Sequence, residues 1–249
     1  MTTMLRLVRA ELRKLTTTKL PWGFLVVLVV IAGLDAAVVA FATDLDGSKT
    51  FVATARDQQS LMAFAFNAMM GTSLFGAIAV AREYGHHTVV PMFLTSPNRT
   101  RAVLAQLIAI LVGGAALAFV GQALVVAGVA LALPSTDHGF LVSGGDLVQL
   151  FAATTLAGAI GATLGAGLGA LIRNVGGAVT AAVLAVFLVP PLTVQLFSDA
   201  AFWIPTSLFA VISGVSTDVS LWAALVAIGA WALVPAAAGL VAVQRRDVV

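Results

Sequence analysis

Arg82 to Arg101, REYGHHTVVPMFLTSPNRTR, is a short polar stretch between two long runs that contain no charged residue. The preceding run covers Ser60 to Ala81 and the following run covers Ala102 to Leu133. The stretch holds three arginines, two histidines and a glutamate, in a chain of which only 10% is charged. Apolar segments of about 20 residues are typical of membrane-spanning helices. The stretch is therefore predicted to be a loop between two spans.

The composition agrees with a membrane protein. Of the 249 residues, 60% are hydrophobic and the mean hydropathy is +1.05, whereas soluble domains are near one half apolar. The chain has no cysteine, which excludes disulfides and thiolate metal sites. A net charge of +2 is a small excess, and its placement has a better explanation than nucleic-acid binding. We expect one all-α integral membrane domain over residues 1–249 and no nucleic-acid partner.

Six spans are predicted, at about residues 21–42, 60–81, 102–133, 147–172, 175–198 and 219–244. The third run has 32 residues, about 48 Å of helix, so it must tilt or extend beyond a bilayer core of about 30 Å. Pro190 and Pro191 predict a kink or break in the fifth span. Residues 200–217 are uncharged but contain Pro205 and several hydroxyl side chains. They are predicted to form a re-entrant or surface-lying hairpin between spans five and six.

Residues 2–19 are predicted to form an amphipathic helix at the membrane interface. Its apolar side chains fall on one helical face and its arginines on another. The apolar face is Leu5, Val8, Leu12 and Leu15, and the basic face is Arg6, Arg9 and Arg13. The alternative is a basic tail that serves only to orient the chain. A signal peptide is disfavoured because its apolar core has about 7–15 residues, and the first run is longer.

The distribution of Lys and Arg predicts the orientation. With six spans and a cytoplasmic N-terminus, 11 of the 13 basic residues fall in cytoplasmic segments. Lys49 and Arg56 alone fall outside. An excess of basic residues marks cytoplasmic loops. We therefore expect a multi-pass protein of the plasma membrane with both termini in the cytoplasm.

Residue types typical of enzymes are missing from the expected spans. No span carries a histidine, and the chain has neither a phosphate-binding glycine-rich loop nor an HExxH motif. Glu83-x-x-His86 copies half of a di-metal motif but occurs once. No catalytic or metal site is predicted. Asp35 is an ionisable residue inside a span, which makes it a candidate for the substrate path. The alternative is that Asp35 reaches the headgroups at the outer end of its span.

Three glycines recur every fourth residue in the fourth span: Gly161, Gly165 and Gly169. Small residues at this spacing let two helix backbones approach closely in lipid. The stripe therefore predicts a close helix contact. It is either a subunit or gate interface, or ordinary packing within the chain.

The loop itself has the pattern of a short cytoplasmic helix. Gly85 is expected to end the entering helix, and Thr88 to cap a new one that carries Met92 and Phe93. Glu83 is expected to fix the start of this helix by pairing with a basic residue or by accepting backbone N–H groups. An apolar helix presented to water favours a protein groove as its partner. The alternative is a loop that lies on the headgroups.

The chain resembles the permease subunits of type-2 ABC exporters. The resemblance lies in the loop and at the C-terminus, whereas the rest matches by layout. The matching residues are Arg82, Glu83, Gly85, Thr88, Val89, Val90, Met92, Phe93, Leu94, Pro97, Arg99, Arg101, Arg245, Arg246 and Asp247. One departure is the pair His86-His87, which adds a residue between the glycine and the threonine of the family pattern and leaves the register of the short helix open.

The resemblance implies a membrane half-transporter. It implies that the cytoplasmic loop at residues 82–101 couples the chain to a separate ABC ATPase that binds ATP and Mg, while the chain itself is no enzyme and binds no cofactor. It also implies a second copy, or a related permease, and contact with membrane lipid. The alternative function is an ATP-independent carrier or a membrane scaffold. Carriers usually show mid-membrane ionisable groups and internal repeats, and the sequence offers only Asp35 and no repeat.

Overall fold

The computed structural model describes residues 2–44, 47–85 and 99–245. Within these ranges the chain is helical and has no strand. Six helical segments are long and apolar enough to cross a membrane. They are Leu20–Phe41, Ala55–Gly85, Thr100–Ser135, Gly144–Ile172, Val175–Leu196 and Leu221–Arg245. For the described residues this confirms the prediction of an all-helical fold with six helices long and apolar enough to span a membrane, each near its expected place.

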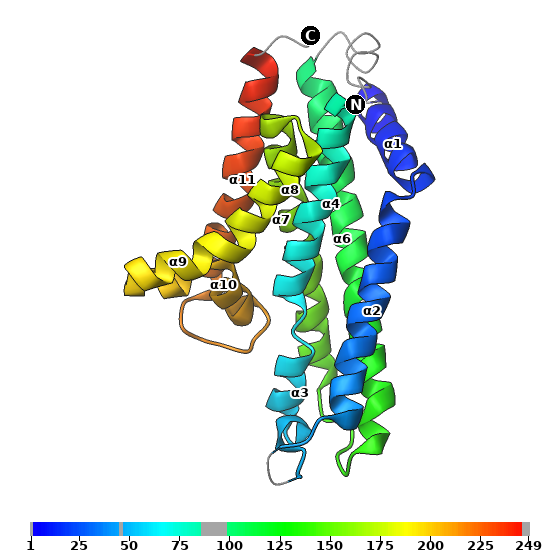
Figure 1. The fold of residues 1–249 in the computed structure, drawn as a ribbon, viewed down its shortest axis with the longest axis vertical. Helices are drawn as coiled ribbons and strands as arrows, with labels where there is room; N and C mark the ends of the chain where they lie inside the picture. The colour runs from blue at the N-terminus through cyan, green and yellow to red at the C-terminus, as the bar shows by residue number, and fades with distance from the viewer. Residues whose placement is uncertain (1, 45–46, 86–98, 246–249) are drawn as a thin grey trace.

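The helices form a long bundle with two central members (Figure 1). Helices α4 and α7 run through the middle, α2 and α6 lie to one side, and α8, α9 and α11 lie to the other. The first turn of α1 and the last turn of α11 lie at the same end. The bounds of these helices are α1 Thr2–Thr17, α2 Leu20–Phe41, α4 Ala65–Gly85, α6 Arg99–Ala132, α7 Gly144–Ile172, α8 Val175–Val183, α9 Val189–Leu196 and α11 Leu221–Arg245.

The glycine stripe of α7 makes a close helix contact in the bundle core. A Cβ atom at Gly161 would overlap the carbonyl oxygen of Met69, and one at Gly169 would lie 2.8 Å from the carbonyl oxygen of Ala77. Gly165 lies between them against Ser73. All three therefore pack on the backbone of α4, which is the arrangement small residues permit. In this chain the stripe joins two helices of the same bundle.

The second span contains a break that the sequence did not predict. Helix α3 (Ala55–Leu61) ends before α4 begins, so residues 62–64 are non-helical. The buried amide of Gln122 in α6 donates a hydrogen bond of 3.0 Å to the carbonyl oxygen of Met62. Its own oxygen accepts a bond of 2.6 Å from the Thr154 hydroxyl of α7. A buried carbonyl needs such a partner. The break is stabilised by side chains from two other helices.

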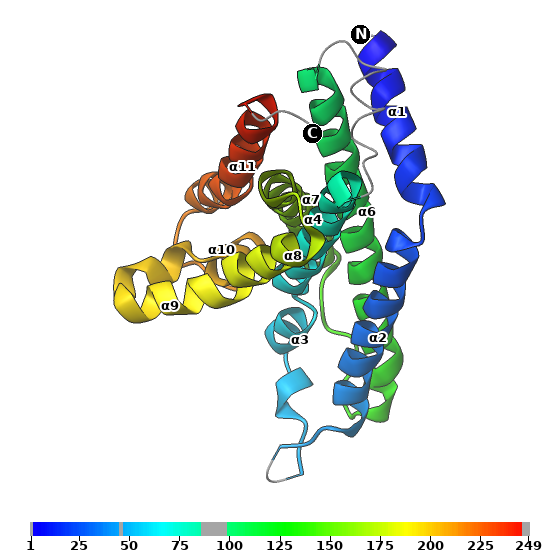
Figure 2. The ribbon, with the colours of Figure 1, turned by 45° about the horizontal axis from the view of Figure 1, so that its top comes forward.

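A π-helical turn interrupts the α-helix of the fifth span just before the two prolines, and the chain stays helical through them. The π-helical turn at Leu184–Leu188 separates α8 from α9. Pro190 and Pro191 are the second and third residues of α9. Proline cannot donate to the preceding turn, and π-turns are common where a helix ladder is disturbed. Figures 1 and 2 both show α9 diverging from the bundle.

The segment between spans five and six does not cross a membrane by itself. It holds a 3₁₀ helix at Ser198–Trp203 and α10 at Pro205–Ile212. Eight residues of α-helix are about 12 Å long, far short of a bilayer core. Leu208 and Phe209 of α10 are buried in a cluster with α7 and α11. The segment is thus tied to the bundle, and its placement in a membrane remains a prediction.

Helix α1 packs on the bundle along its second half. Leu15 is buried in a cluster with Phe75 of α4 and Ile110 of α6, and Leu12 packs against it. Leu5, by contrast, is 68% exposed. The expected apolar face therefore reaches the bundle near its C-terminal end, and its first turns are left open among the described residues.

Candidate functional site

The last turn of α4 sends three consecutive side chains to three different neighbours. Successive residues of an α-helix point about 100° apart. Arg82 faces the junction between α1 and α2, Glu83 faces α1, and Tyr84 faces the end of α7. This turn is the first part of the Arg82–Arg101 stretch singled out in the sequence. The end of α4 is therefore a junction at which several helices meet.

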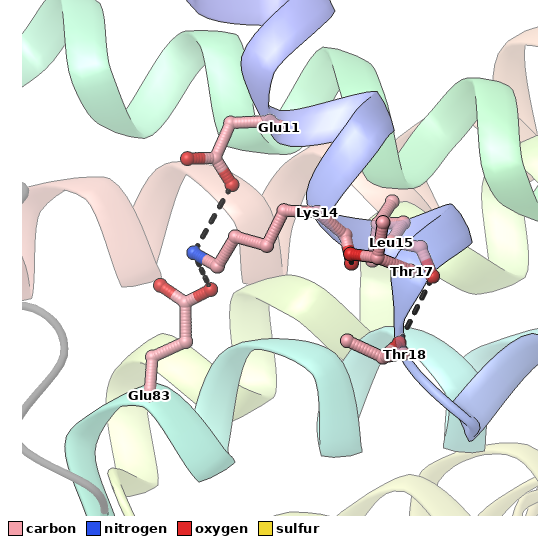
Figure 3. Close-up of polar contacts among 6 residues, drawn as sticks. All are labelled: Glu11, Lys14, Leu15, Thr17, Thr18 and Glu83. Atoms are coloured by element: carbon pink, nitrogen blue, oxygen red, sulfur yellow. Dashed lines mark hydrogen bonds and ion pairs between the residues drawn. The ribbon is translucent and has the colours of Figure 1, made fainter.

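Glu83 forms a buried ion pair with α1 (Figure 3). Its side chain is about 6% exposed, and one carboxylate oxygen contacts the ammonium group of Lys14. The same ammonium group lies 3.3 Å from Oε2 of Glu11, one turn earlier in α1. A buried carboxylate is costly unless a cation and hydrogen bonds compensate for lost water. Lys14 therefore stabilises the charge on Glu83 and links α1 to α4.

The end of α1 positions Lys14. Three consecutive threonine hydroxyls, from Thr16 to Thr18, donate to the carbonyl oxygens three residues earlier at 2.9, 3.1 and 2.9 Å. The last carbonyl groups of a helix have no partner within the helix, so such bonds satisfy them. The chain then turns at residues 18–19 and starts α2 with Leu20 and Pro21, where proline is tolerated. The turn and the burial of Leu15 together direct Lys14 toward α4.

Tyr84 connects the same turn to α7 and α11. The guanidinium carbon of Arg173 lies 5.0 Å from the centre of the Tyr84 ring, within the range of a cation–π contact. Nη2 of Arg173 also donates a bond of 3.4 Å to the carbonyl oxygen of Ala242 in α11. Arg173 therefore bridges the ends of three helices, α4, α7 and α11.

The backbone of Arg173 explains how its side chain reaches this position. Its φ is 58°, in the left-handed region that usually favours glycine at a helix C-terminus. The residue ends α7, and Asn174 at once caps α8 by accepting a 3.0 Å bond from the N–H of Gly177. An arginine in this conformation costs on the order of 1–3 kcal/mol. Its retention there fits a role for the guanidinium group in joining the helix ends.

Only three of the predicted coupling residues lie within the described ranges. Arg82, Glu83 and Gly85 lie in the last turn of α4, and the described part of α4 ends at Gly85. The remaining predicted positions lie outside the described residues: Thr88, Val89, Val90, Met92 and Phe93. Their predicted short helix therefore stays a prediction. The expected basic partner of Glu83 is Lys14, which was not among the sequence candidates.

The other sequence candidates lie apart from this junction. Arg6, Arg9 and Arg13 of α1 are exposed, as expected for the basic face of an interfacial helix. Asp35 is half-buried in α2, and no hydrogen bond joins it to another described residue. Its role in a substrate path stays a prediction. Among the described residues, no group of three metal-binding side chains is present.

A second set of polar contacts, at the opposite end of the bundle, was missed in the sequence. The buried amide group of Gln58 donates to the carbonyl oxygens of Val52 and Gly139, and its oxygen accepts from the N–H of Leu141. Gln59 donates a 3.0 Å bond to the carbonyl oxygen of Ser213. Helix α3 thus joins the segment around residues 139–141 to the end of α10 near Ser213. The signal that could have indicated such contacts is the pair of adjacent glutamines at the start of an apolar run.

No protein-family model matches the sequence, and no curated protein matches it.

Proposed function

We propose that this chain is the membrane-spanning subunit of an ATP-driven ABC exporter. In this proposal two copies, or one copy and a related permease, form the substrate path. A separate ABC ATPase binds ATP and Mg and docks on the loop at residues 82–101. The chain contributes no ATPase chemistry of its own.

The observation that carries the proposal is the junction at the last turn of α4. Glu83 pairs with Lys14 of α1, and Tyr84 contacts Arg173 at the end of α7. This turn begins the stretch at residues 82–101 that resembles a coupling segment. A coupling element must pass movement to the spans through packed and bonded contacts. The contacts of Glu83 and Tyr84 supply such a route to α1, α7 and α11.

The glycine contact extends this route along the bundle. Gly161, Gly165 and Gly169 bring α7 onto the backbone of α4 over about two helical turns. Helices packed at backbone distance move together because few side chains can adjust between them. In our proposal, ATP-driven closure of the ATPases displaces the loop, and α4 and α7 respond as one unit. Rigid-body movement of this kind is a common switching mechanism.

The proposal also fixes an orientation. Lys14, Arg82, Arg173 and Arg245 belong to the end of the bundle that holds α1 and the last turn of α11. By the positive-inside rule this end faces the cytoplasm, and the protein resides in the plasma membrane. Helix α1 then lies along the inner surface of the membrane with its exposed arginines at the headgroups.

The test is association with an ATPase. The chain and the ABC ATPase encoded beside it are co-expressed, purified through a tag on the chain, and assayed for ATP hydrolysis in lipid nanodiscs. We expect a stable complex whose hydrolysis exceeds that of the ATPase alone. If the ATPase neither copurifies nor changes its turnover, the exporter proposal is wrong, and the carrier or scaffold alternative gains.

A further inference from the structure

A cavity of about 390 Å³ lies beside the junction between α1 and α2. Two cations line it: Lys19, which directly precedes α2, and Arg82 of α4. The rest of the lining is Leu20, Gly23, Phe24 and Val27, which follow one face of α2. Its size lies in the range of small-molecule sites. The cavity thus has a basic part and an apolar wall.

Neither Lys19 nor Arg82 forms an ion pair with a carboxylate of the described residues. The two ion pairs found there both involve Lys14, which contacts Glu11 and Glu83. Glu83, the acidic neighbour of Arg82, is held by Lys14. The described charged residues around the cavity are three cations (Lys14, Lys19 and Arg82) and two carboxylates (Glu11 and Glu83), so the net charge there is positive. This cavity therefore favours an anionic ligand.

The apolar wall decides the class of anion. From Leu20 to Val27 the face of α2 extends about 10 Å away from the cations, along the axis of a membrane span. Phe24 closes the inner side, where its ring meets that of Phe75 of α4 edge to face at 5.6 Å. A Cβ atom at Gly23 would meet nothing within 4 Å, so this part of the wall is open. Inorganic phosphate gains nothing from contact with an apolar wall, whereas an acyl chain can pack against it.

We propose that this cavity binds an anionic phospholipid, with the phosphate at Lys19 and Arg82 and one acyl chain along Leu20, Gly23 and Val27. Basic pockets between spans are typical sites for anionic headgroups. The site lies beside the ion pair that holds α1 on α4, and the lipid would contact α2 and Arg82 of α4. This inference does not depend on coupling to an ATPase.

Native mass spectrometry of the purified chain tests the site, with titrations of phosphatidylglycerol, phosphatidylcholine and inorganic phosphate. Wild type should retain phosphatidylglycerol in preference to phosphatidylcholine and should not retain phosphate. Lys19→Gln with Arg82→Gln should weaken phosphatidylglycerol binding on the order of thirtyfold, the loss expected for two cations that face an anionic lipid. The control pair Arg6→Gln with Arg13→Gln removes the same charge from exposed positions of α1 outside the cavity. These arginines face the headgroups in general and not this site, so the control pair should weaken binding several-fold less than the cavity pair does.

A second variant separates the apolar wall from the charges. Gly23→Leu fits the open space and fills the cavity, so it should also release phosphatidylglycerol while both cations remain. Three outcomes would each overturn the proposal. They are equal losses in the cavity pair and the control pair, retention of inorganic phosphate as well as lipid, or unchanged lipid binding in Gly23→Leu.

Discussion

Gly165 offers the most direct test of how α4 and α7 pack. A methyl group there would overlap the carbonyl oxygen of Ser73 and would lie 2.7 Å from its carbonyl carbon and 2.8 Å from the amide nitrogen of Ala77. Carbon atoms in good contact are about 3.5–4.0 Å apart. Gly165→Ala therefore forces the helices apart by roughly 1 Å, because both obstacles are backbone and cannot rotate away.

The expected cost follows from this geometry. Overpacking a well-packed core costs about 1–3 kcal/mol, and the fixed backbone obstacles place Gly165→Ala near 3 kcal/mol. Gly71 in α4 is the matched control, because a Cβ atom there meets nothing within 4 Å. Alanine is favoured over glycine by about 1 kcal/mol inside a helix, so Gly71→Ala should be neutral or stabilising. The same chemical change is predicted to have opposite effects at the two positions.

Thermal unfolding of both variants in detergent measures the difference. Gly165→Ala should lower the midpoint by roughly 10 °C, the shift expected for about 3 kcal/mol in a chain of this size. Gly71→Ala should leave it unchanged or raise it. A Gly165→Ala protein as stable as the parent would refute the backbone contact and the view that α4 and α7 move as one unit.

Three further predictions follow from other parts of the bundle. Lys14→Met should destabilise the chain by about 3 kcal/mol because it leaves the buried carboxylate of Glu83 without its cation, and the added change Glu83→Gln should restore part of this loss. Thermal unfolding of the two variants measures the coupling, and additive effects would exclude the ion pair. Gln122→Leu should cost about 1–3 kcal/mol in the same assay, because the broken second span loses its buried donor, and an unchanged midpoint would contradict that role. Single cysteines at Asp137 and Thr217 should react with a label added outside intact cells, and single cysteines at Thr17 and Val175 should stay protected. The reverse pattern would mean that the topology is inverted.

The spans were predictable because each apolar run is long enough to cross a bilayer and is bounded by charges or prolines. The break at residues 62–64 was not predictable from local sequence, since Met62, Ala63 and Phe64 include no helix breaker. It depends on Gln122, 60 residues later, which supplies a hydrogen bond to the freed carbonyl group. A helix can end at good helix formers when another element satisfies its backbone.

The candidate site was only partly predictable, because its contacts also depend on residues that lie far apart in the sequence. Glu83 stood out as a carboxylate next to a long uncharged run, but several basic residues were equally plausible partners in sequence. Burial of Leu15 and the turn after Thr18 select Lys14. Arg173 gave no local signal, because its contact with Tyr84 arises from a left-handed backbone conformation at a helix end.

The central claim is that the loop at residues 82–101 docks the chain on an ABC ATPase. The direct measurement is the Kd of the ATPase for the chain in nanodiscs, compared with Met92→Ser combined with Phe93→Ser. Burial of each side chain is worth about 1.5–3 kcal/mol, so the double change should raise Kd by at least about a hundredfold. Phe140→Ser with Leu141→Ser, exposed apolar residues at the opposite end, should leave Kd unchanged. A Kd for the loop variant within twofold of wild type would contradict the account.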